Sequence, residues 1–144
     1  MKPMSSSFLI GLVVAAIAVA GCGASPGVAG EVEPAITIKE QQDGISVLTL
    51  SEHAAERLSI VTAQVQDRGA QKIVPYAAVI YDAQGATWTY TVTSTLTYRR
   101  APITVDEIAG DEAILSGGPD AGTEVVIVGA AELYGAETGV GGGH

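Results

Sequence analysis

A single cysteine, Cys22, limits how this chain can stabilise a fold. It is the only cysteine among 144 residues, so no intramolecular disulfide can form and a hydrophobic core must hold the folded part together. Cys22 follows an apolar run of 13 residues, 8–20, and Lys2 places a positive charge before that run. A membrane-spanning helix needs about 20 apolar residues, whereas the core of a signal peptide needs about 7–15. The N-terminus therefore predicts an exported chain.

The residues before Cys22 are typical of a lipoprotein processing site. Val19-Ala20-Gly21-Cys22 resembles the lipobox of bacterial lipoproteins, in which an aliphatic residue and two small residues precede the cysteine. The resemblance implies that residues 1–21 are a cleaved signal peptide and that Cys22 carries the lipid. Each buried lipid methylene contributes ~0.8 kcal/mol, so two or more acyl chains form a stable membrane anchor. The alternative is an ordinary cleaved signal peptide with an incidental cysteine.

The mature chain divides into three parts by composition. Residues 22–35 are rich in Gly, Ala and Pro and have no hydrophobic period, which predicts a flexible tether. Such a tether spans roughly 20 Å on average, so the domain that follows should lie close to the membrane. Residues 36–135 are the predicted β domain, with Ile36 or Ile45 as the start of its folded part. Residues 136–144 are expected to be a disordered Gly-rich tail.

The charge balance narrows the range of partners. Seven basic residues stand against sixteen acidic ones, which gives a net charge of −9. A surface this acidic repels the phosphate backbone of nucleic acids, so we expect no nucleic-acid partner.

A strict alternation over residues 87–93 predicts a strand. Trp88, Tyr90 and Val92 share one face, which should belong to the core, and four threonines line the other face. The preceding residues 82–85, Asp-Ala-Gln-Gly, predict a hairpin turn whose glycine takes a positive φ.

The rest of the domain is a series of short apolar runs separated by turns. Ser51 is a predicted N-cap of a short helix, because Leu50, Ala54 and Leu58 then share one face. A second helical turn is expected at 130–134. We therefore expect a mainly β fold, a small antiparallel β-barrel or sandwich-like domain with one or two short helices. The other predicted strands are 45–50, 60–65, 72–74, 77–81, 97–99, 103–108, 113–115 and 124–128.

Several segments between Ile73 and Leu133 follow the order of a known domain. They are VPYAAV at 74–79, GATWTYTV at 85–92, RAPITV at 100–105, DEAILSGG at 111–118 and GTEVVIVGA at 122–130. This set resembles the membrane-proximal C-terminal domain of periplasmic adaptor subunits (membrane fusion proteins) of resistance-nodulation-division efflux pumps. Residues 50–63 are similar to an N-terminal segment of heavy-metal-type adaptors.

The resemblance implies a non-enzymatic, adaptor-like component of a transmembrane transport or efflux system, with an inner-membrane transporter subunit as its partner. Complete adaptors carry lipoyl-like and α-helical hairpin modules between the two matching parts. Here only residues 64–72 lie between them, so the chain cannot bridge two membranes alone. It is expected in the cell envelope, lipid-anchored on the extracytoplasmic side, periplasmic or at the cell surface. The alternative is a free-standing envelope lipoprotein that binds a small ligand or ion without a pump.

Few residues are candidates for chemistry. His53 and His144 are the only histidines and lie 91 positions apart, which is not the spacing of a metal site. We expect no catalytic residues, no metal site and no cofactor, and we interpret His53 as a helix-surface residue. Tyr98, Arg99 and Arg100 are the candidate contact with a partner's carboxylates. The alternative for the two arginines is a local salt bridge with nearby acidic residues.

Overall fold

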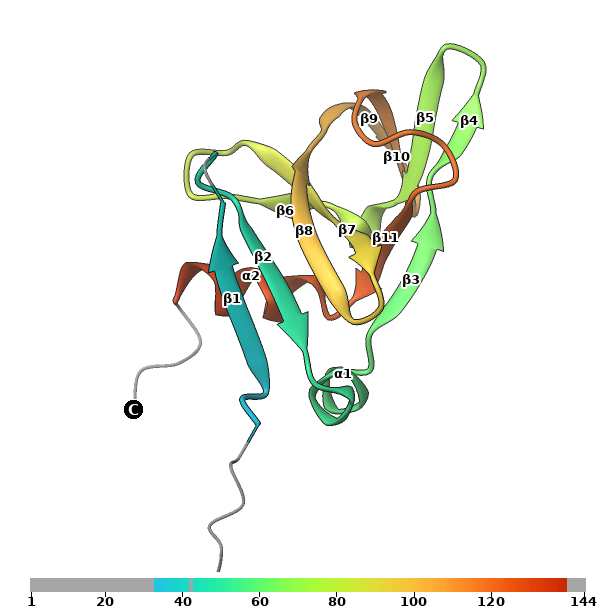
Figure 1. Cartoon of the computed structure of the whole chain (residues 1–144). Coiled ribbons are helices and arrows are strands. Elements are labelled where there is room, and N and C mark those ends of the chain that lie inside the picture. The colour runs from blue at the N-terminus through green and yellow to red at the C-terminus, as the bar shows by residue number, and fades with distance from the viewer. Residues whose placement is uncertain (1–32, 42, 140–144) are drawn as a thin grey trace, which may run out of the picture. The chain divides into compact units, whose positions relative to one another are not determined.

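The computed structural model describes residues 33–41 and 43–139, and it confirms a mainly β, sandwich-like domain (Figure 1). The strands form two antiparallel sheets, and both sheets remain open. The predicted lipidation residue Cys22, the predicted signal peptide and the part of the predicted tether before Glu33 lie outside the described residues, as does the part of the predicted tail after Gly139. No helix among the described residues is long and apolar enough to cross a bilayer.

The larger sheet begins at Ile36, the earlier of the two predicted starting points. Its strands follow the order β1-β2-β8-β7-β11-β3, and β6 pairs with β7 beside that path. The strand bounds are β1 Ile36–Glu40, β2 Ser46–Leu50, β3 Val61–Gln64, β6 Ile80–Tyr81, β7 Thr87–Ser94, β8 Thr97–Pro102 and β11 Glu124–Val128.

The smaller sheet follows the order β4-β5-β10-β9. Its bounds are β4 Gln66–Arg68, β5 Gln71–Pro75, β9 Thr104–Ala109 and β10 Glu112–Gly117, and a 3-10 turn, η1, covers Tyr76–Ala78. Val74 and Leu115 of this sheet pack with Val125 of the larger sheet in one core cluster. The sandwich is therefore held by apolar side chains between the sheets, as a chain without internal disulfides requires.

Two helices cover the other core cluster, on the larger sheet (Figure 1). Helix α1 spans Glu52–Leu58, and the Ser51 hydroxyl accepts a hydrogen bond from the Ala54 amide at 3.2 Å, which confirms the predicted cap. Helix α2 spans Ala130–Thr138, and its Leu133 is fully buried.

The boundary of the predicted tail needs a correction. Residues 136–138 were assigned to a disordered tail, but they form the last turn of α2, and Gly139 ends the helix with φ 75°. Glu137 lies in that turn and bonds to Tyr90 and Arg100 of the sheet. These contacts extend the helix beyond its predicted length.

The predicted hairpin at residues 82–85 is confirmed. The Asp82 carboxylate accepts hydrogen bonds from the backbone amides of Gln84 and Ala86, at 2.9 and 2.8 Å. Its other oxygen accepts from the Trp88 indole at 2.9 Å, and this bond, the largest cause, lowers the pKa of Asp82. Asp82 thus fixes both the turn and the first aromatic side chain of β7.

Strand β7 forms where it was predicted, and on the predicted core face Tyr90 is fully buried whereas Trp88 and Val92 are half-buried. The threonine face is not uniformly solvated, however. Thr89 is also fully buried, and its hydroxyl has no hydrogen-bond partner among the described residues. Burial on both faces makes Thr89 and Tyr90 part of the interior.

Candidate functional site

The structure separates Tyr98, Arg99 and Arg100, the three predicted contact residues on β8. Side chains alternate between the faces of a strand, so Tyr98 and Arg100 share the face under the helices and Arg99 points to the other face. Tyr98 is only 5% exposed and belongs to the core cluster beneath α2. The three side chains therefore do not form one surface, and a partner contact there remains a prediction.

Arg100 belongs to a buried group of polar and charged side chains that we call the Glu137 network. Its members are Tyr90, Arg100 and Glu137. The Arg100 guanidinium lies 3.1 Å from the Glu137 carboxylate, and the two side chains are 15% and 4% exposed. The Tyr90 hydroxyl donates to the same carboxylate at 2.5 Å, and the Ser46 amide donates to it at 3.2 Å. Each charge in the network is thus paired and hydrogen-bonded.

Aromatic rings complete the surroundings of Arg100. Its guanidinium carbon lies 4.3 Å from the centre of the Trp88 ring and 5.8 Å from that of Tyr134, distances typical of cation–π contacts. Burial and the bond to Glu137 raise the pKa of Tyr90 well above its usual value. The network joins α2 to β7 and β8, and its role is structural.

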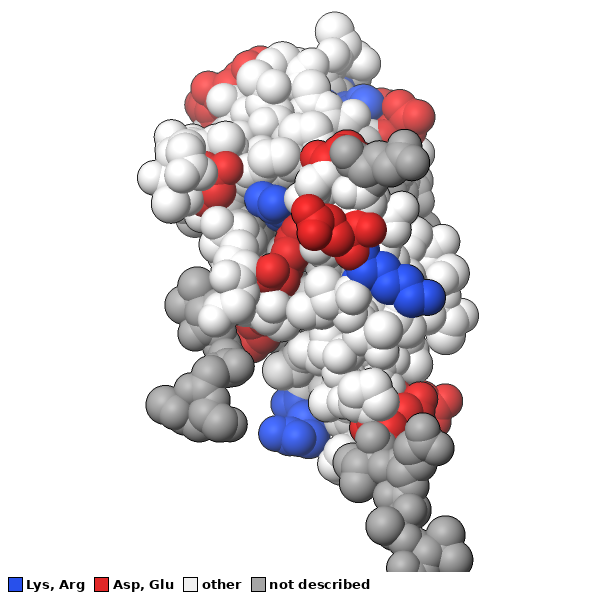
Figure 2. Space-filling view, turned by 60° about the vertical axis from the view of Figure 1, so that its left-hand side comes forward, with Lys and Arg blue, Asp and Glu red and all other residues white. Residues whose placement is uncertain are grey.

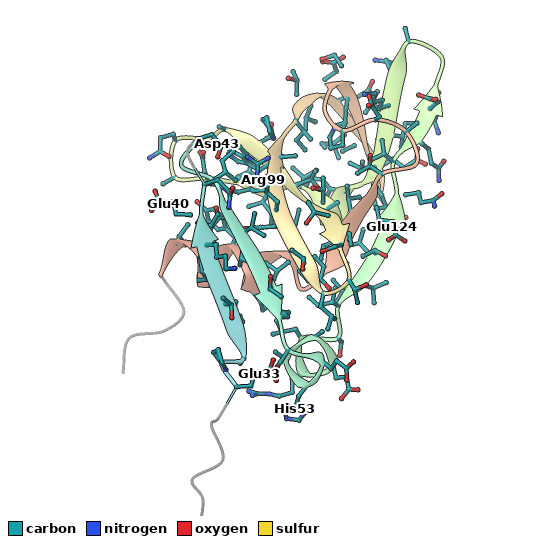
Figure 3. All side chains as sticks on the ribbon, viewed as in Figure 1. Glu33, Glu40, Asp43, His53, Arg99 and Glu124 are labelled. Carbon is teal, nitrogen blue, oxygen red and sulfur yellow. The ribbon has the colours of Figure 1, made fainter. Side chains whose placement is uncertain are left out.

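Arg99 makes a surface ion pair with Asp43 (Figure 3). A hydrogen bond from the Ile45 amide, and then the Arg99 guanidinium, lower the pKa of the Asp43 carboxyl. The local ion pair proposed as the alternative from the sequence is therefore present for both arginines.

A different site emerges beside α1, where the described chain begins. A cleft of about 800 Å³, which we call the α1 cleft, opens between the helix and the segment that leads into β1. Figure 3 shows Glu33 and His53 at this end of the domain. The charged or titratable residues that line the cleft are Glu33, Glu52, His53 and Arg57, and its apolar lining comes from Pro34, Ala35, Leu50, Ala54 and Leu96.

The basic side chains of the α1 cleft differ from most others in the domain. Among the Lys and Arg residues that the structure describes, four form ion pairs with acidic side chains. Arg57 and Lys39 form none with another described residue. His53 and Arg57 are four positions apart on α1, a spacing that places them on one side of the helix.

Sequence analysis did not single out Arg57 or connect Glu33 with the helix. The i, i+4 spacing after the Ser51 cap was a signal for pairing His53 with Arg57. No sequence pattern relates Glu33 to His53, because they line one cleft only after β1 and β2 have paired and Leu50 has led into the helix.

The free sheet edges form a second notable feature. β1 and β3 end the larger sheet and β9 ends the smaller one, and each carries an exposed large apolar side chain: Ile38, Val61 and Ile108, respectively. The other edge strand of the smaller sheet, β4, is polar throughout, and the two-residue strand β6 pairs only with β7.

Comparison with known proteins adds no information on function, so the function has to be inferred from the fold, the α1 cleft and the free sheet edges. No family model, curated protein or solved structure matches the chain. Within residues 33–41 and 43–139, no three His, Cys, Asp or Glu side chains are grouped to hold a metal ion.

Proposed function

We propose that this protein is a membrane-anchored lipoprotein whose β domain is a non-enzymatic, adaptor-like component of a transmembrane transport or efflux system. The structural observation that carries the proposal is the set of open sheet edges with exposed apolar residues. The lipobox-like sequence at Cys22 and the ordered resemblance over residues 73–133 support it from the sequence.

An open edge can accept another polypeptide. The outer backbone of an edge strand has no partner strand, so it can bond to another chain. Ile38, Val61 and Ile108 add apolar surface at three of these edges. Soluble proteins commonly protect such edges with charged residues, as Asp67 and Arg68 do on β4. Charged residues also lie on β1 and β9, whereas β3 carries none. The three edges with exposed apolar residues are the proposed docking sites, and β3 is the least protected of them.

The position of the anchor defines where the partner lies. Only ten residues separate Cys22 from Glu33, so an anchored domain stays within roughly 20 Å of the bilayer. The partner is accordingly the extracytoplasmic part of an inner-membrane transporter subunit. The acidic surface, visible as red patches in Figure 2, favours a partner face that carries basic residues.

Affinity purification tests the docking proposal. The tagged, full-length protein is expressed in its native host and isolated from membranes in mild detergent. We expect a transporter subunit to be recovered with it, and we expect Ile38→Lys, Val61→Lys or Ile108→Lys at the docking edge to abolish recovery. Gln66→Lys, on the polar β4 edge, is the matched control and should change nothing. Absence of any transporter subunit from the wild-type preparation would reject the adaptor role and favour the free-standing lipoprotein.

The anchor is tested separately with Cys22→Ala. We expect the variant to lose metabolic labelling by lipid and to move to the soluble fraction. Continued lipid labelling of this variant would show that the assignment of Cys22 is wrong.

A further inference from the structure

We propose that the α1 cleft binds the zwitterionic phosphoethanolamine headgroup of a membrane phospholipid. In this arrangement Arg57 and His53 hold the phosphate, and Glu33 and Glu52 hold the primary ammonium group. The inference rests on the proposed lipid anchor, which brings the cleft within reach of the bilayer.

The α1 cleft contains opposite charges that form no ion pair with one another. Glu33, Glu52 and Arg57 all line it, yet none forms an ion pair with another described residue. Unpaired charges around one cleft remain available to a ligand, whereas the charges of the Glu137 network are already satisfied. A ligand that carries both signs can satisfy both sets of charges at once.

The residues assigned to the phosphate and those assigned to the ammonium group have the hydrogen-bonding chemistry that each group requires. The planar guanidinium of Arg57 can donate two parallel hydrogen bonds to phosphate oxygens, and His53 lies on the same side of α1 as a further donor. A primary ammonium group has three N–H donors, which suit the carboxylates of Glu33 and Glu52. The quaternary ammonium of phosphocholine has no N–H donor and lacks these bonds.

The net charge of the protein also favours a zwitterionic headgroup over an anionic one. At −9 the chain repels anionic headgroups such as phosphatidylglycerol. A headgroup with no net charge is not repelled, and it gains the local contacts in full. Pro34, Leu50 and Leu96 provide apolar lining for the glycerol part of the lipid.

The two histidines make the proposal directly measurable. The full protein, purified in dodecyl maltoside, which contains no phosphate, gives imidazole NMR signals from His53 and His144 only. On titration with glycerophosphoethanolamine, a phosphodiester that has no net charge like the lipid headgroup, we expect a saturable shift of the His53 signal, with His144 as the internal reference. Arg57→Gln should weaken binding about tenfold, the effect of losing one charge-assisted hydrogen bond. Lys39→Gln, which removes the other basic side chain without an ion pair, should leave binding unchanged.

Ligand selectivity decides between a built site and general attraction. The proposal requires glycerophosphoethanolamine to bind more tightly than inorganic phosphate and glycerophosphocholine, and Glu33→Gln with Glu52→Gln should remove that preference. Equal binding of the three probes, or no shift of His53, overturns it.

A second arm tests the bilayer as the source of the headgroup. The lipidated protein is placed in nanodiscs of phosphatidylcholine with or without phosphatidylethanolamine. We expect the His53 signal to shift only when phosphatidylethanolamine is present, and identical spectra overturn the lipid assignment. The soluble titration does not need the anchor, so its outcome is independent of the Cys22 labelling experiment and of transporter recovery.

Discussion

The two helices of this domain carry their charges in opposite ways. Helix α2 places Glu137 against Arg100 and Tyr90, where the charges are buried and paired. Helix α1 places His53 and Arg57 along an open cleft, where Arg57 has no ion-pair partner among the described residues. Both helices cover the same core cluster on the larger sheet.

This difference shows that the role of a basic residue depends on its burial and on whether an acidic partner lies beside it. A buried charge that loses its partner is strongly unfavourable, so the Glu137 network contributes to stability only while it is complete. An exposed charge keeps its hydration and costs little to leave unpaired, so the α1 cleft can retain charges for a ligand. Substitutions in the Glu137 network should therefore cost far more stability than substitutions at exposed charges.

The Glu137→Gln variant is expected to have the largest effect on stability. It leaves the Arg100 guanidinium buried without a counter-charge, which should lower the free energy of unfolding by about 3–5 kcal/mol. Denaturant unfolding measures the change. Glu132→Gln, an exposed position on the same helix, is the control and should stay within about 0.5 kcal/mol of wild type. A loss equal to that of the control would show that the network is not structural.

Tyr90→Phe tests the hydroxyl of the same network. At neutral pH the loss of its bond to Glu137 should cost about 1–3 kcal/mol, because a buried carboxylate loses a donor. In the wild type, burial and Glu137 raise the pKa of the folded tyrosine above its usual 10.0. The unfolded chain therefore releases this proton first, and stability falls as the pH rises above about 10.

The variant lacks this titration, so its free energy of unfolding should fall less steeply over the same alkaline range. Urea unfolding at several pH values between neutrality and the alkaline limit compares the two slopes. Parallel slopes would contradict the assigned cause of the shift.

Ser51→Ala tests the α1 side at a smaller scale. The variant removes the hydroxyl that accepts from the Ala54 amide, and N-cap losses cost about 1 kcal/mol. Because the cap fixes the first turn of α1, glycerophosphoethanolamine binding should also weaken. Chemical denaturation and the His53 titration measure the two effects, and Ser94→Ala at the exposed end of β7 is the control. Unchanged stability would show that the cap does not support the helix.

Arg99→Gln should have the smallest effect. Its pair with Asp43 lies at the surface, with side-chain exposures of 34% and 51%, and such pairs contribute about 0–1 kcal/mol. Thermal or denaturant unfolding should place it close to wild type, whereas Arg100→Gln at the next position should be several-fold more destabilising. Equal losses at the two positions would remove the distinction between buried and surface pairs.

The sequence predicted the local elements because their signals are local. The Ser51 cap, the turn at Asp82 and the strand that buries Tyr90 depend on residues a few positions apart, and the structure confirms all three. The sandwich-like packing could also be predicted from the sequence, because each of many short strands must bury one of its faces.

The candidate site could not be predicted from the sequence because it depends on contacts between residues far apart in the chain. Arg99 and Arg100 look alike in the sequence, yet strand alternation sends one to solvent and the other beneath α2. The length of α2 was underestimated because Glu137 is stabilised by residues 37 and 47 positions away. Helix propensity alone could not predict that Tyr90 and Arg100 would be the partners of Glu137.

By itself, then, the sequence determined the β-rich class, the turns and the first helix cap, all set by short-range backbone and side-chain preferences. It also supplies the expected lipid anchor at Cys22, which stays a prediction. The tertiary structure was needed to show which charged side chains form ion pairs within the domain, as Arg100 does, and which form none with another described residue, as Arg57 does. The physical reason is that pairing and burial depend on which strands and helices meet, and those contacts join residues that no local pattern relates.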